Sequence, residues 1–107
     1  MALTIKEKEA LLHLKEILTQ RYKIQDFRLY GSKVRNEDTT ESDIDIMIEL
    51  EDMNPQIEFE IDKIIFDINL TYNCFISATF FTEKELKEGP LEASPLYRSI
   101  QKEGVKI

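Results

Sequence analysis

Residues 29–50 read LYGSKVRNEDTTESDIDIMIEL, and this stretch decides the fold. The pair Gly31-Ser32 ends one apolar run, and ten residues later Asp43 and Asp45 stand at the start of another. From there to Leu50, isoleucine or leucine occupies every second position. Alternate residues of a strand point to the same face. The pattern therefore predicts a strand with one apolar face and two carboxylates at the start of the other.

The two carboxylates have the spacing of a shared cation site. The Cα atoms of residues i and i+2 in a strand lie about 6.5 to 7 Å apart, so Asp43 and Asp45 can both reach one hard cation. Proteins commonly hold Mg²⁺ through one or two carboxylates, with substrate phosphates completing its shell. Asp43 and Asp45 are therefore the predicted metal ligands and catalytic residues.

The residues after the first apolar run suit a phosphate group. Gly31 has no Cβ and allows a close backbone approach, and Ser32 offers a hydroxyl and a backbone amide to an anion. Lys33 and Arg35 can neutralise phosphate charge. A Gly-Ser pair alone is typical of a turn, and two alternate aspartates alone of a solvated strand edge. Their combination at this spacing indicates a nucleotide site.

The rest of the chain is expected to alternate between helices and strands. Thr4 and Glu7 form a capping-box pattern, and Asn54-Pro55 and Ser94-Pro95 are typical helix starts. The segment after Ser32 is polar and predicts a turn or a short helix followed by a loop. The expected elements are helix 5–22, strand 27–30, strand 43–50, helix 55–70, strand 74–81, a short helix after residue 82, a helix from 94 to 104 and an edge strand over 105–107. This order predicts an α/β (α+β) fold with helices packed on a small mixed sheet.

Composition narrows the class of protein. With 107 residues, 42% hydrophobic and 33% charged, residues 1–107 are expected to form a single globular domain. A net charge of −7 argues against a broad basic face for nucleic acid. The N-terminal residues contain neither a signal-peptide core nor a membrane span, which predicts a cytoplasmic protein. One cysteine and one histidine make no zinc site, so a bound metal would be held by oxygen.

Gly31-Ser32, ten residues and then Asp43-Ile44-Asp45 resemble the G-S-x10-D-x-D signature of the polymerase beta-like nucleotidyltransferases, in particular their minimal bacterial branch. Residue-level resemblance covers about 29–50, and the order of elements agrees over nearly the whole chain. The resemblance implies transfer of a nucleoside monophosphate from Mg-bound NTP, with ATP the expected donor, to a hydroxyl. It also implies an antitoxin paired with a small helical HEPN-type partner, which it adenylylates.

Two positions depart from the family pattern. The third family carboxylate would fall near Phe75, where CFISATFF offers no acid. Its absence predicts slow transfer, or dependence on a carboxylate from a partner or from a residue such as Asp67. Asn36 stands where the family often has glycine. An alternative function follows from the missing acid, namely a weak or inactive member that neutralises a HEPN-like partner by contact.

Overall fold

The computed structural model describes residues 3–35, 43–89 and 94–107. The loop expected after Ser32 lies outside these residues over 36–42, Asn36 included. The elements are α1 (Ile5–Arg21), β1 (Ile24–Tyr30), α2 (Ser32–Arg35), β2 (Ile44–Leu50), α3 (Pro55–Tyr72), β3 (Ile76–Thr82), α4 (Glu83–Glu88), α5 (Pro95–Glu103) and β4 (Val105–Lys106). The predicted order of helices and strands is confirmed, with the segment after Gly31 forming a one-turn helix.

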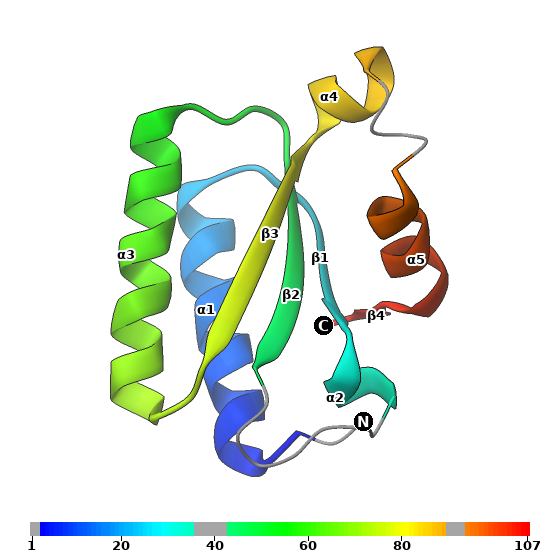
Figure 1. The fold of residues 1–107 in the computed structure, drawn as a ribbon. Helices are drawn as coiled ribbons and strands as arrows, with labels where there is room; N and C mark the ends of the chain where they lie inside the picture. Colours follow the sequence, from blue (N-terminus) through cyan, green and yellow to red (C-terminus); the bar gives the residue numbers. More distant parts are fainter. Residues whose placement is uncertain (1–2, 36–42, 90–93) are drawn as a thin grey trace.

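The strands form one mixed sheet in the order β3-β2-β1-β4 (Figure 1). β1 runs antiparallel to both β2 and β4, whereas β2 and β3 are parallel and α3 connects them. The register pairs Tyr30 of β1 with Asp45 of β2. It also pairs Ile44 of β2 with Ile76 of β3. The small mixed sheet predicted from the sequence is therefore confirmed, and the pairing brings the two halves of the motif to one end of it.

Helices cover both faces of the sheet. α1 and α3 lie side by side on one face, and α5 lies on the other (Figure 1). The alternation in β2 explains this arrangement, because Ile44, Ile46 and Ile48 pack with the leucines of α1 and the isoleucines of α3. Met47 points the other way and packs with Ile100 of α5. Asp45 has the same parity as Met47, so it belongs to the face turned toward α5.

Side chains fix the helix starts at the expected places. The capping box of α1 is complete, and the side chain of Asn54 accepts a hydrogen bond from the amide of Ile57 at the start of α3. Among the described helices, none is both long and apolar enough to cross a membrane.

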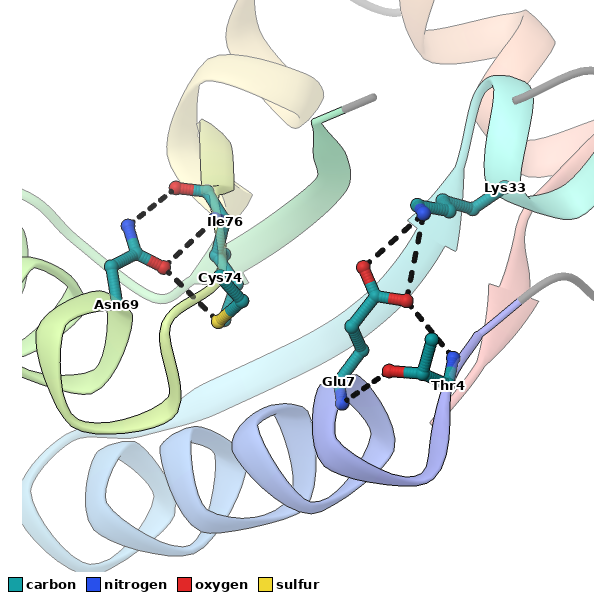
Figure 2. A network of polar contacts seen from close by, with 6 residues as sticks. All are labelled: Thr4, Glu7, Lys33, Asn69, Cys74 and Ile76. Carbon is teal, nitrogen blue, oxygen red and sulfur yellow. Dashed lines mark hydrogen bonds and ion pairs between the residues drawn. The ribbon is translucent and has the colours of Figure 1, made fainter. Parts of the chain in front are cut away.

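Two strand starts differ from the prediction by two or more residues. β1 begins at Ile24 rather than at 27, because a register shift after Ile24 interrupts the alternation that marks a strand. β3 begins at Ile76 rather than at 74. The side-chain oxygen of Asn69 in α3 accepts from the Ile76 amide at 2.8 Å, and its nitrogen donates to the Ile76 carbonyl at 3.2 Å (Figure 2). Cys74 therefore belongs to the connection that ends α3.

Candidate functional site

The two acids of the motif lie at the start of β2. Asp43 is exposed and immediately precedes the strand, while Asp45 is its second residue and is half-buried. The amide of Ile44, between them, donates to the carbonyl of Phe75 at 2.8 Å. This pairing with β3 fixes the backbone that carries both carboxylates.

Gly31 lies directly against Asp45. It follows the last residue of β1 and has a φ of +80°, a left-handed conformation that favours glycine. A Cβ at this position would lie 2.6 Å from Oδ2 of Asp45 and 3.3 Å from its Cγ. The sequence predicted a close approach at Gly31, and the structure shows that the approaching group within the chain is this carboxylate.

The electrostatics of Asp45 suit a cation. Burial raises the pKa of Asp45, the charge of Asp43 raises it further, and Arg35 acts in the opposite direction. Two neighbouring carboxylates whose negative charges repel each other fit a divalent metal such as Mg²⁺, whose remaining ligands are water and phosphate. Within the described residues, no group of three or more Asp, Glu, His or Cys side chains is placed to hold a metal alone. The described residues could therefore supply two carboxylate ligands to a cation and leave its other positions to water or phosphate.

The helix α2 carries three further residues of the predicted site. The amides of Val34 and Arg35 donate to the carbonyl of Gly31 at 3.1 and 3.3 Å, which forms its single turn. Ser32 begins this turn and is partly buried. The guanidinium of Arg35 lies 3.5 Å from Glu103 of α5, with both side chains half exposed. The positive charge of Arg35 lowers the pKa of Asp45, against the two causes that raise it.

Lys33 lies away from solvent, between α2 and α1. Its side chain is only 2% exposed, and its ammonium lies 3.2 Å from Oε2 of Glu7 (Figure 2). Lys33 therefore pairs with an acid of α1 instead of lying exposed at the surface. From the sequence, only a capping role was predicted for Glu7, because the two residues are 26 positions apart and a lysine in a polar stretch is expected at the surface.

Phe75 lies beside the acids at the position where a third carboxylate was expected. Ile44 pairs with Ile76, and one residue earlier the same register sets Asp43 alongside Phe75. The aromatic side chain is 64% exposed, so packing does not require a phenylalanine there. Ser77, two residues on, pairs with Asp45.

Asp67 does not join this site. It lines a hollow of about 480 Å³ between α1 and α3, together with residues that include His13 and Lys63. These two helices cover the opposite face of the sheet from Asp45. His13 accepts or donates a hydrogen bond with the hydroxyl of Tyr72 at 3.0 Å. The suggestion that Asp67 replaces the third carboxylate is therefore wrong for this arrangement.

Comparison with known proteins gives a consistent result. A family model described as nucleotidyltransferase domain matches residues 11–107. A protein of Methanocaldococcus jannaschii provisionally named a protein adenylyltransferase is 49% identical over 47 residues, which are 44% of this chain and 47% of the relative. A second such protein of the same organism is 37% identical over 67 residues, 61% of this chain and 68% of the relative. The chain thus spans about half the length of the first relative and about two thirds of the second.

Two solved structures share the fold. The crystal structure of a toxin-antitoxin with AMP-PNP superposes with a TM-score of 0.62 at 16% identity, covering 92% of this chain and 70% of that one. A mutant of the toxin-antitoxin MntA-HpeT gives a TM-score of 0.57 at 15% identity, covering 94% and 70%. The sheet order and the helices on its two faces are therefore an arrangement already known in solved proteins.

Proposed function

Because the chain belongs to the nucleotidyltransferase domain family, we propose that it transfers AMP from Mg-bound ATP to a hydroxyl group of a partner protein. The observation that carries the proposal is the contact between Gly31 and Asp45. This contact brings Gly31, which we propose binds phosphate, next to Asp45, which we propose binds metal, at one end of the sheet.

Each residue of the site has a role in this proposal. Asp43 and Asp45 hold Mg²⁺, which when bound neutralises the triphosphate and polarises the phosphorus under attack. Gly31 and Ser32 contact the triphosphate through backbone and hydroxyl groups, and Arg35 offsets its charge. Gly31 also keeps space for the carboxylate of Asp45, since any side chain there would displace it.

ATP as the donor is supported by the relatives and by one neighbour. Two relatives carry the name protein adenylyltransferase, and one structural neighbour was solved with AMP-PNP, an ATP analogue. In the proposed reaction the acceptor oxygen attacks the α-phosphorus, a new phosphorus-oxygen bond forms, and pyrophosphate leaves. The hydroxyl proton passes to solvent or to a base supplied with the acceptor.

A partner protein is proposed on the same grounds. Both structural neighbours are named as toxin-antitoxin proteins, and such a name pairs two proteins with each other. The resemblance described from the sequence makes a small helical HEPN-type protein the proposed acceptor. An antitoxin role in the cytoplasm follows from that pairing.

Phe75 favours a second candidate function. The position beside Asp43 carries an exposed aromatic side chain instead of an acid. Without that acid the domain would bind nucleotide but transfer slowly, and it would silence its partner by contact. The two candidates differ in whether AMP becomes covalently attached.

Calorimetry with Mg-ATP tests the site. Asp43→Asn and Asp45→Asn should each weaken binding at least about tenfold, equivalent to roughly 1.4 kcal/mol, because each removes a charged metal ligand. Glu51→Gln is a matched control, since Glu51 directly follows the same strand and its ion pair with Lys23 is exposed. Equal affinity in all variants would refute the site.

Transfer is tested separately with α-labelled ATP, Mg²⁺ and the product of the neighbouring gene. Label on that protein, lost in Asp45→Asn, is the expected result. A stable complex that silences the partner without label would instead support the second candidate.

A further inference from the structure

The helix α2 cannot hold its own position. It has four residues and one turn, and helices of this length are unstable in water without tertiary contacts. Yet it directly follows Gly31 and carries Ser32 and Arg35, three residues of the proposed site. The contacts that anchor α2 therefore determine where that site lies relative to Asp45.

One of these anchors is a buried ion pair with α1. Lys33 is 2% exposed at its side chain and Glu7 is 13% exposed, with Nζ 3.2 Å from Oε2 and 3.5 Å from Oε1. Buried charges of this kind are stable only when paired, and removing one partner is strongly destabilising. Val34, the next residue, packs against the main core and adds an apolar contact.

Glu7 is itself held rigidly. Its Oε1 accepts from the amide of Thr4 at 2.9 Å, and its own amide donates to the hydroxyl of Thr4 at 3.1 Å (Figure 2). These bonds are the capping box of α1, whose first turn also favours a negative charge. The carboxylate therefore presents a fixed point on α1, whose leucines lie in the core, to the ammonium of Lys33.

We propose that Glu7 is a positioning residue of the nucleotide site, which acts through Lys33 to fix α2 and with it Gly31 and Arg35. The inference rests on the proposed function for the identity of the ligand. It assigns to Lys33 a role through Glu7 rather than through direct contact with phosphate. The two roles make opposite predictions for nucleotide affinity when the ion pair with Glu7 is broken. If Lys33 contacts phosphate directly, its release from Glu7 should leave affinity unchanged or raise it. If Lys33 positions α2, its release should lower affinity.

The decisive variant is Glu7→Gln, because glutamine also serves in a capping box but removes the negative charge that lies 3.2 Å from the ammonium of Lys33. Calorimetry should show Mg-ATP affinity lowered by about tenfold or more. Glu9→Gln, on an exposed position of the same helix, removes the same charge and should change affinity less than about twofold. Unchanged or raised affinity in Glu7→Gln would overturn the proposal.

Amide hydrogen exchange without nucleotide tests the tether independently of the ligand. The amides of Val34 and Arg35 should exchange at least about tenfold faster in Glu7→Gln than in Glu9→Gln, because their bonds to Gly31 close the turn. Equal exchange in both variants would refute the tether. A parent protein that fails to bind Mg-ATP would instead count against the proposed function, while exchange still decides the tether.

A double variant separates positioning from direct contact. Lys33→Met added to Glu7→Gln removes the buried ammonium, whose pairing with Glu7 the first change has broken, and keeps a long side chain that can pack in its place. Recovery of Mg-ATP affinity and of slow exchange, relative to Glu7→Gln alone, is the expected result. An affinity lower than that of the single variant would show that Lys33 contacts the nucleotide itself, and would overturn the proposal.

Discussion

Replacing Gly31 with alanine is expected to damage both stability and the proposed site. A left-handed φ of +80° costs an L-residue about 1 to 2 kcal/mol. For a domain of about 100 residues, each kcal/mol lowers Tm by roughly 4 °C or more, so this strain alone predicts a fall of about 4 to 8 °C. The new methyl would also lie 2.6 Å from Oδ2 of Asp45 and must displace that carboxylate. Mg-ATP affinity should therefore fall at least about tenfold.

A double-mutant cycle separates the two causes. Asp45→Ala removes the carboxylate oxygen and Cγ that the methyl would meet, but it leaves the backbone of Gly31 unchanged. Gly31→Ala should therefore lower Tm less in the Asp45→Ala background than in the parent. Asn73→Ala measures the cost of a left-handed backbone away from the site, because Asn73 has a φ of 51° at the end of α3. Equal losses of Tm in both backgrounds would refute the carboxylate contact, and no loss in either would refute the backbone requirement.

Two further predictions concern the neighbours of Gly31. Asp45→Asn should raise the free energy of unfolding at neutral pH, because burial and the charge of Asp43 raise the pKa of Asp45 above its ordinary value of 3.8. The folded parent therefore binds this proton more tightly than the unfolded chain does. Its stability falls as pH rises from 3.8 through the raised folded pKa and is level above it. Urea unfolding of parent and variant across this range should give diverging curves, and parallel curves would contradict the sign. Phe75→Asp should speed AMP transfer at least about tenfold by adding an acid beside Asp43, with Phe66→Asp as a control of similar exposure on α3. Equal rates in both variants would place the missing group elsewhere.

Local patterns predicted most of the fold. The alternation from Ile44 to Leu50 depends on which face of β2 is buried, and the helix starts depend on capping side chains a few residues away. Such signals lie within one element and can be recognised in the sequence. The start of β3 was harder to predict, because the side chain of Asn69 in the preceding helix hydrogen-bonds both the amide and the carbonyl of Ile76.

The site was predicted as a set of residues but not as a set of contacts. The spacing of glycine and aspartates indicated phosphate and metal binding, yet it could not show that Gly31 lies against Asp45, since that contact depends on the antiparallel register of β1 and β2. The pairing of Lys33 with Glu7 was equally hidden. It joins the capping residue of α1 to the one-turn helix α2, and nothing in either segment alone indicates the other.

The place of β3 in the sheet has a consequence for how such a domain can evolve. β2, which carries Asp45, is hydrogen-bonded on both sides, whereas β3 is an edge strand and Phe75 precedes it with its side chain exposed. Residues at such an exposed end are exchanged at little cost to folding. Under the proposed function, the position at which an acid would favour transfer thus lies at an exposed end of an edge strand. A substitution at Phe75 would then change the proposed chemistry while leaving the packing of the domain, and selection for its stability, unchanged.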